Sequence, residues 1–226
     1  MSATEPVKNN SDLPVRVASA IIMLVIAGGA LWFGGWLWYG FVALVAGACF
    51  FELARLVRKA FGSGLRATLG VLAGAAYVGL AGLSLVNLPT GVLLGVILVV
   101  IGTDVGAYFS GRAIGGPKIA PTISPSKTWA GLVGGALLAG TVSMSLFVYN
   151  VGALTLSVML IIAFLIGAAL AVVAQCGDFL ESWLKRKAGQ KDSSTLIPGH
   201  GGVFDRIDGL LPVAIAAMPL WALHPA

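Results

Sequence analysis

The chain has 226 residues, of which 58% are hydrophobic and only 10% are charged, and its mean hydropathy is +0.96. Soluble domains carry about 25% charged residues, so this composition excludes an ordinary soluble domain and predicts an all-α polytopic membrane protein. The net charge of +5 could suit nucleic acid. An excess of Lys and Arg on the cytoplasmic side of a membrane protein explains it better, and we expect no nucleic-acid partner.

The chain begins with a short polar segment, residues 1–14, which we interpret as a cytoplasmic leader to a single integral membrane domain covering residues 1–226. The apolar run that follows has no convincing cleavage site before a soluble domain, so it predicts a retained helix rather than a removed signal peptide. Cys49 and Cys176 both lie in apolar runs, and their spacing predicts neither a disulfide scaffold nor a zinc site.

Seven apolar stretches long enough to cross a bilayer follow one another along the chain. They cover roughly residues 15–33, 36–57, 65–86, 89–109, 129–149, 153–178 and 207–223. The first two are separated only by Gly34 and Gly35, so the turn between them must be very tight.

The positions of the basic residues provide a check on the seven predicted spans. When the connections are assigned alternately to two sides, one side holds two, four, three and five of the 14 Lys and Arg residues, and the other side holds none. Cytoplasmic connections are enriched in Lys and Arg, so the sequence predicts a cytoplasmic N-terminus and an outer C-terminus. All nine acidic residues lie at the same ends or loops, so we expect any chemistry at the cytoplasmic face.

The first long polar loop, residues 110–128, follows an apolar run that contains Asp104. An acid in an apolar span is costly and is a functional candidate by default. The loop ends with Ser124, Lys127 and Thr128, and hydroxyls beside a lysine before a helix favour phosphate binding. A Ser-Pro turn that merely starts a helix explains the same residues equally well.

The second polar loop, residues 181–206, follows Asp178, contains Asp205 and precedes Asp208. Asp178 ends the sixth span, where it needs a partner if it lies at bilayer depth and none if it lies among the headgroups. Asp205 and Asp208 would face one side of a helix, with Arg206, a metal or both between them. Carboxylates from separate helices suit Mg²⁺. The alternative is that Asp205 and Asp208 are ordinary acidic residues at a helix N-terminus, where the helix dipole favours negative charge.

Glycines and cations accompany these acids. In residues 198–202 (PGHGG) the glycines allow the backbone to approach an anion, and His200 is either a donor to phosphate or a structural residue. Basic loops also bind anionic lipid without specificity, which is the alternative for this cluster. Its members are Lys185, Arg186, Lys187 and Lys191.

Carboxylates for hard cations, cations for phosphates and a surrounding bilayer together favour phosphoryl or nucleotidyl transfer onto a lipid phosphate. The nucleophile is then an ionised phosphate oxygen, which needs charge neutralisation rather than a strong base. We weigh three alternatives: a CTP-dependent polyprenol or lipid-alcohol kinase, an ion-coupled transporter and a non-catalytic basic membrane anchor. A transporter would need polar residues across the outer half of the bilayer, and the sequence has no Asp, Glu, Lys or Arg there.

The stretch from Ser182 to Asp208 resembles the signature of the phosphatidate cytidylyltransferase (CDP-diacylglycerol synthase) family. The residues that follow the pattern without a gap are Ser182, Leu184, Lys185, Arg186, Lys191, Asp192, Ser194, Pro198, His200, Gly201, Gly202, Asp205, Arg206 and Asp208. Residues 103–115, 123–135 and 177–182 are also similar to the family, so the resemblance covers a catalytic region at about 100–209.

This resemblance implies transfer from CTP to phosphatidate, giving CDP-diacylglycerol and pyrophosphate, with Mg²⁺ and a candidate second cation. It implies an all-helical homodimer among membrane lipids, which we expect in a bacterial inner membrane with the site facing the cytoplasm. Asp178, Asp205 and Asp208 would hold metal and would be catalytic together with Lys185 and Arg186. The implied substrate-binding residues are Asp104, Ser124, Lys127, Thr128, Lys191, His200, Gly201, Gly202 and Arg206.

The chain departs from the family pattern at two positions. Ala130 stands where the family has Glu, so the role of that carboxylate is absent or has moved. Gly209 stands where Ser is usual, which removes a hydroxyl next to Asp208. The chain is also short for the family, with fewer N-terminal helices than we expect.

Overall fold

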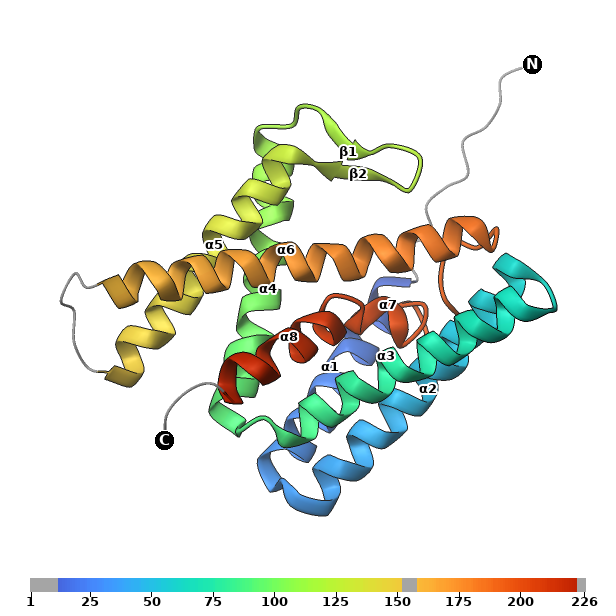
Figure 1. The fold of residues 1–226 in the computed structure, drawn as a ribbon, viewed down its shortest axis with the longest axis horizontal. Helices are drawn as coiled ribbons and strands as arrows, with labels where there is room; N and C mark the ends of the chain where they lie inside the picture. The colour runs from blue at the N-terminus through green and yellow to red at the C-terminus, as the bar shows by residue number, and fades with distance from the viewer. Residues whose placement is uncertain (1–11, 152–157, 223–226) are drawn as a thin grey trace.

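The computed structural model describes residues 12–151 and 158–222, and it is built almost entirely from helices (Figure 1). Its elements are α1 (Asp12–Phe33), α2 (Gly35–Phe61), α3 (Leu65–Asn87), α4 (Thr90–Ala113), β1 (Lys118–Ala120), β2 (Ser124–Thr128), α5 (Trp129–Val151), α6 (Val158–Lys187), α7 (Phe204–Ile207) and α8 (Leu210–Ala222). The predicted all-α polytopic class is confirmed.

Six of these helices, α1 to α6, are long and apolar enough to cross a membrane. The seventh predicted span, 207–223, is not one continuous helix within the described residues, because Asp208 and Gly209 separate α7 from α8. With 13 residues, α8 is about 20 Å long at 1.5 Å per residue, which is shorter than the hydrocarbon core. The predicted leader lies mostly outside the described residues, and α1 already begins at Asp12.

The two polar loops are shorter than predicted, because helices extend into them. α4 continues to Ala113 and α6 continues to Lys187, and both end in basic residues, which the negative end of the helix dipole favours. Most of the remainder of the first loop is an antiparallel hairpin, with Lys118 paired to Thr128 and Ala120 paired to Ser124. Residues 124–128 are therefore a strand that leads into α5, not a turn at a helix start.

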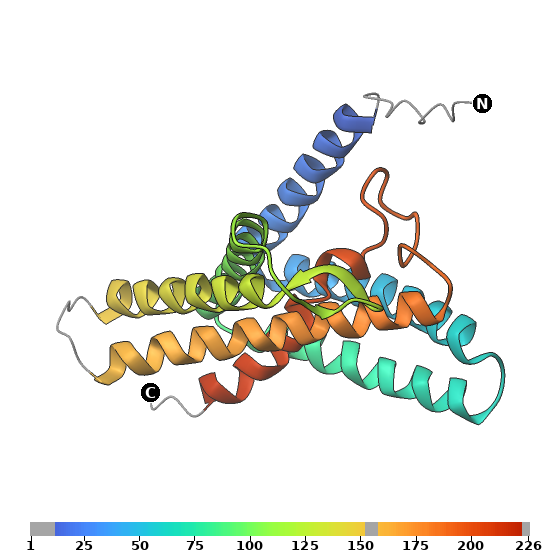
Figure 2. The same ribbon diagram turned by 90° about the horizontal axis from the view of Figure 1, so that it is seen from above.

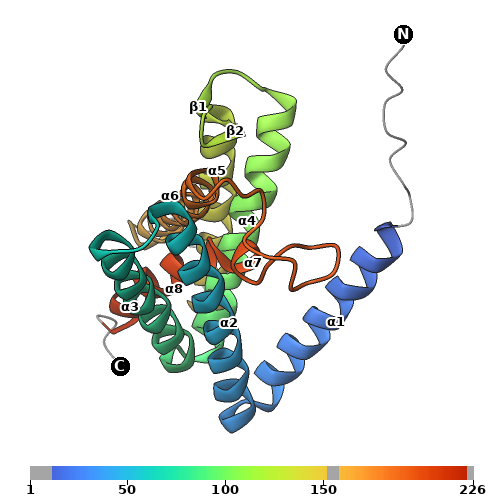
Figure 3. The ribbon, with the colours of Figure 1, turned by 90° about the vertical axis from the view of Figure 1, so that its right-hand side faces the viewer.

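Successive long helices run in alternate directions. The α1–α2 and α3–α4 connections lie at the bottom of the molecule, and the hairpin lies at its top (Figures 1 and 3). The α1–α2 turn consists of Gly34 and Gly35, whose φ angles of 61° and 52° lie in the left-handed region that only glycine adopts readily. This confirms the predicted tight turn. The alternation agrees with the collection of Lys and Arg at one end of the bundle.

The core lies between α2, α3, α4, α6 and α8, whereas α1 extends away from the other helices (Figure 2). None of the residues in the apolar stretch of α1 is buried against the rest of the described chain. In the C-terminal half of α4 and the first turns of α5, glycines bring the two backbones together, as small residues do between helices in lipid. A Cβ atom on Gly106 would lie 2.5 Å from the carbonyl oxygen of Gly134.

This close approach makes Gly106→Ala a test of the packing. Because the blocking atom belongs to the backbone, the two helices must separate, and we expect unfolding in detergent to need about 1–3 kcal/mol less free energy. Gly79→Ala is the matched control, since a Cβ there meets nothing within 4 Å. Alanine favours helix, so this control should be neutral or stabilising by up to about 1 kcal/mol. Equal melting temperatures for the two variants would contradict the α4–α5 packing.

Candidate active site

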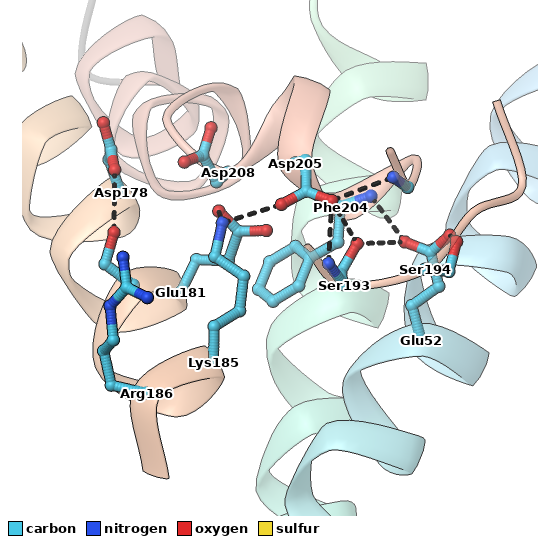
Figure 4. A network of polar contacts seen from close by, with 12 residues as sticks. Glu52, Asp178, Glu181, Lys185, Arg186, Ser193, Ser194, Phe204, Asp205 and Asp208 are labelled. Atoms are coloured by element: carbon cyan, nitrogen blue, oxygen red, sulfur yellow. Dashed lines mark hydrogen bonds and ion pairs between the residues drawn. The ribbon is translucent and has the colours of Figure 1, made fainter. Parts of the chain in front are cut away.

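Acidic and basic side chains meet where α6 passes the short helix α7 (Figure 4). α6 supplies Asp178, Glu181 and Lys185, which are spaced three and four residues apart and therefore lie along one face of the helix. Asp205 lies within α7, and Asp208 lies just after it. The two segments are held together at Gly177, where a Cβ atom would lie 2.2 Å from the carbonyl oxygen of Asp208.

Lys185 is the cation at the centre of this group. Its Nζ lies 2.7 Å from Oδ1 of Asp205 and 2.9 Å from Oε2 of Glu181. The side chains are 15%, 6% and 2% exposed respectively, so both ion pairs are shielded from water. We predicted Arg206 or a metal beside Asp205, but Arg206 is exposed and the cation that contacts this carboxylate is Lys185.

The second oxygen of Asp205 organises the loop before α7. Oδ2 accepts hydrogen bonds from the backbone N–H of Ser193 (2.9 Å), the Ser193 hydroxyl (2.7 Å) and the backbone N–H of Gly202 (2.8 Å). Burial alone would raise the pKa of Asp205, but the hydrogen bonds from Lys185, Ser193 and Gly202 outweigh it and hold that pKa well below its usual range. Asp205 is therefore ionised at neutral pH.

A second lysine approaches the site from the hairpin. Lys127 on β2 forms an ion pair with Asp178 and donates a hydrogen bond of 2.6 Å to Oε1 of Gln175. Its Nζ also lies 5.0 Å from the centre of the Phe179 ring. This contact joins two polar segments that are about 50 residues apart in the sequence, and it brings both predicted loops to one site.

A cavity of about 350 Å³ lies beside this ion pair, between α4, β2, α5 and α6. The polar and charged residues along its wall include Asp104, Arg112, Ser126, Lys127, Gln175 and Asp178. Two cations and two carboxylates around one opening can bind a phosphate group together with its counterion. Asp104 and Lys127, which were both predicted to bind substrate, therefore line the same cavity, and their role in binding stays a prediction.

Asp208 and Glu181 are the other two acids of this group. Burial and the neighbouring Asp178 raise the pKa of Asp208, against the hydrogen bond that its Oδ1 accepts from the N–H of Gly209 (2.9 Å). Oε1 of Glu181 is buried and has no hydrogen-bond partner among the described residues. A buried unpartnered carboxylate oxygen is costly, and a hard cation is a natural partner for it.

The predicted metal triad of Asp178, Asp205 and Asp208 is only partly assembled. In residues 12–151 and 158–222 no group of three or more His, Cys, Asp or Glu side chains is arranged to hold a metal ion. Asp178 and Asp205 instead bind Lys127 and Lys185. The oxygen-rich set nevertheless fits a divalent cation in its chemistry, with Glu181 as a further donor. Metal binding stays a prediction.

Several other predicted residues have structural contacts. Thr128 is buried, and its Oγ1 accepts a hydrogen bond from the N–H of Gly131 (3.0 Å), so it caps the start of α5. Ser124 is buried in β2. Nε of Arg186 donates to the carbonyl oxygen of Ile123 (3.3 Å), which fixes the hairpin turn to α6 rather than leaving the guanidinium unbound.

The glycine loop after α6 is close to α1. Nδ1 of His200 lies 2.8 Å from the Ser19 hydroxyl, which also donates to the carbonyl oxygen of Pro198 (3.1 Å). Gly201 has a φ of 82°, which explains the glycine by conformation. Lys191 is exposed. None of these contacts tests a role in substrate binding, which stays a prediction for His200, Gly201 and Lys191.

Sequence reasoning missed Glu52, Glu181, Gln175 and Ser193. Glu181 follows Asp178 by three residues on a helix, and this spacing was a usable signal. Gln175 is uncharged, and Ser193 is one of two adjacent serines, so neither has a distinctive pattern. Glu52 lies on α2, far from the other site residues in the sequence, and only the fold brings it close.

Comparison with known proteins identifies the family of this chain. Residues 68–224 match the family model described as "Cytidylyltransferase family". The chain belongs to the cytidylyltransferase family. All of the residues in the described site except Glu52 fall within the matched range.

Three relatives of this family member carry the name phosphatidate cytidylyltransferase. The protein of Brucella suis biovar 1 (strain 1330) is 46% identical over 150 residues, which cover 63% of this chain and 53% of the relative. That of Pseudomonas aeruginosa is 47% identical over 149 residues, covering 65% and 54%. That of Haemophilus influenzae is 44% identical over 131 residues, covering 58% and 44%. The match thus spans about half the length of these relatives.

Proposed function

We propose that this cytidylyltransferase transfers the cytidylyl group of CTP to phosphatidate, giving CDP-diacylglycerol and pyrophosphate for phospholipid synthesis. The observation that carries the proposal is a cavity in a bundle of apolar helices whose wall includes Lys127, Asp104 and Asp178. The ion pairs of Lys185 with Glu181 and Asp205 lie further along the same face of α6. The names of the relatives support the same reaction.

In this reaction a phosphate oxygen of phosphatidate forms a bond to the α-phosphorus of CTP. The bond from that phosphorus to the bridging oxygen breaks, and pyrophosphate leaves with the electron pair. The attacking oxygen is already ionised, so no general base is required. Lys127 and Lys185 would lower the repulsion between lipid phosphate and triphosphate, and Arg112 on the cavity wall would bind a phosphate oxygen.

The acids of the site would hold Mg²⁺. Asp178, Asp205 and Asp208 are the proposed ligands, and Glu181 would contribute Oε1, which has no hydrogen-bond partner among the described residues. Bound Mg²⁺ would neutralise charge on the triphosphate and on the leaving pyrophosphate. The same carboxylates would also supply ligands to a second cation, which is part of the proposal.

The integral membrane location follows from the six apolar helices. We propose that the membrane is a bacterial inner membrane and that the site faces the cytoplasm, because every Lys and Arg lies at that end of the predicted topology. Phosphatidate would enter between helices from the lipid, and CTP would enter from the cytosol. A homodimer among membrane lipids is also proposed, on the family resemblance alone.

The test is an assay with CTP labelled at one of two positions. Purified protein, phosphatidate and Mg²⁺ should transfer label from the α-phosphate of CTP to lipid and none from the γ-phosphate. A lipid-alcohol kinase would give the opposite result, with γ-label in the lipid and CDP as the leaving product. Failure to label lipid from either position would refute both reactions.

A further inference from the structure

Glu52 on α2 is almost completely buried, with 1% of its surface exposed, yet the proposed reaction does not use it. It also precedes residue 68, where the match to the family model begins. Removing a carboxylate from water costs several kcal/mol unless hydrogen bonds replace its hydration. The groups that bind Glu52 therefore indicate what this carboxylate stabilises.

Among the described residues, the four hydrogen bonds to Glu52 come from the segment that joins α6 to α7 and from Phe204, the first residue of α7 (Figure 4). Oε1 accepts from the Ser194 hydroxyl (2.6 Å) and from the backbone N–H of Val203 (3.1 Å). Oε2 accepts from the Ser193 hydroxyl (2.9 Å) and from the backbone N–H of Phe204 (2.8 Å). One side chain of α2 thus holds both ends of the loop that carries the glycines.

Ser193 joins this network to the active site. Its hydroxyl lies 2.9 Å from Oε2 of Glu52 and 2.7 Å from Oδ2 of Asp205. A hydroxyl has one proton, so it donates to one of the two carboxylates at a time. Asp205 additionally receives the backbone N–H groups of Ser193 and Gly202. Glu52 and Asp205 therefore both bind the same two loop segments, residues 193–194 and 202–204.

Gly202 shows how closely these groups are packed. A Cβ atom at this position would lie 2.0 Å from Oγ of Ser193 and 2.5 Å from Oε2 of Glu52. The absence of a side chain is thus required by the Glu52 network itself. This is a packing reason for a glycine that the sequence pattern alone assigns to anion binding.

We propose that Glu52 is a positioning residue for Asp205. It acts by fixing Ser193 and the Gly202–Phe204 backbone, which set the direction of the Asp205 carboxylate towards Lys185. The catalytic part of this inference rests on the proposed function, whereas the positional part does not. Glu52 does not line the cavity described above, so its effect should appear in turnover rather than in CTP binding.

The test uses Glu52→Gln in the full-length protein. The amide group turns one acceptor oxygen into a donor that faces other donors, so two of the four hydrogen bonds are lost. We expect hydrogen–deuterium exchange of the Ser193 and Gly202 amides, which bind Asp205 and not Glu52, to become at least about tenfold faster. We also expect kcat to fall at least about tenfold while KM for CTP changes less than about threefold.

Two further variants separate the Glu52 contacts from a general loosening of the core. Ser193→Ala removes only the bridging hydroxyl, and it should reduce kcat non-additively with Glu52→Gln if the two act through one path. Cys49→Ala is the matched control, because Cys49 is fully buried about one turn earlier on α2 and should loosen the core without changing these amides. If Glu52→Gln does not fold, Ser194→Ala carries the test, because the Ser194 hydroxyl donates to Glu52 (2.6 Å) and the structure gives it no bond to Asp205. Faster exchange at Gly202 is the expected result.

Unchanged protection of the Ser193 and Gly202 amides would overturn the positioning role. Equal acceleration in Cys49→Ala would also overturn it, since general loosening would then explain the effect. If wild-type protein forms no CDP-lipid, the proposed function fails, and the exchange measurement still decides whether Glu52 positions Asp205.

Discussion

Replacing Lys185 with methionine should abolish turnover and destabilise the protein more than any other single lysine substitution at the site. Lys185 is the cation between Asp205 and Glu181, and both carboxylates are almost fully shielded from water. Removing one partner of a buried ion pair leaves an uncompensated charge, which costs about 3–5 kcal/mol. Loss of the same cation from the reacting phosphates should lower kcat by at least about a thousandfold. Label transfer from CTP and thermal unfolding in detergent measure the two effects.

Lys187→Met is the matched control for this experiment. Lys187 lies two residues further along α6, and its Nζ is 3.9 Å from the centre of the Phe61 ring. Losing this cation–π contact should cost about 0.5–1 kcal/mol and leave turnover unchanged. If Lys185→Met kept wild-type turnover, or if both variants lost it equally, Lys185 would not have the role described.

Lys127→Met should lower kcat by about a hundred- to a thousandfold with a much smaller loss of stability. Lys127 binds Asp178 and Gln175 on the wall of the cavity, but it lies on a hairpin at the edge of the bundle, outside the helix core. We therefore expect a stability loss of about 1–2 kcal/mol, from a partly exposed ion pair with Asp178 and one hydrogen bond to Gln175. Comparing kcat with the unfolding temperature separates this prediction from the one for Lys185.

Lys59→Met controls for the loss of one positive charge from the same end of the bundle. Lys59 is exposed near the end of α2 and does not line the cavity that contains Lys127. Its substitution should leave both turnover and stability close to wild type. A similar fall in turnover for Lys59→Met would attribute the effect to net surface charge instead of to the contact with Asp178.

Most of the fold could be predicted from hydrophobicity and charge. The alternation of apolar runs with Lys and Arg on one side predicted seven spans and the turn at Gly34-Gly35. Six spans and the turn are confirmed, because lipid restricts the chain to helices that satisfy their own backbone, whereas the seventh is divided between α7 and α8. The hairpin was not predicted. Its strands have three and five residues, too few to show an alternating pattern, and Arg186 and Lys127 attach them to α6, which is distant in the sequence.

The site was predictable where its residues are close in sequence. Asp205 and Asp208, and the lysines of α6, could be recognised from spacing and from the family resemblance. The pairs that connect distant segments could not. Neither the contact between Lys127 and Asp178 nor that between Glu52 and Ser193 leaves a trace in local sequence, because both depend on how α2, α6 and the hairpin pack.

The one-sided placement of charge has a consequence for how the proposed reaction uses the bilayer. Headgroups of the lipid substrate and the lipid product would both remain in a single leaflet throughout turnover, so neither has to pass through hydrocarbon. The opposite connections contain no Lys or Arg that could guide an ion inward. The proposed reaction could therefore turn over charged lipids continuously while the surrounding membrane stays electrically insulating and keeps its transverse asymmetry.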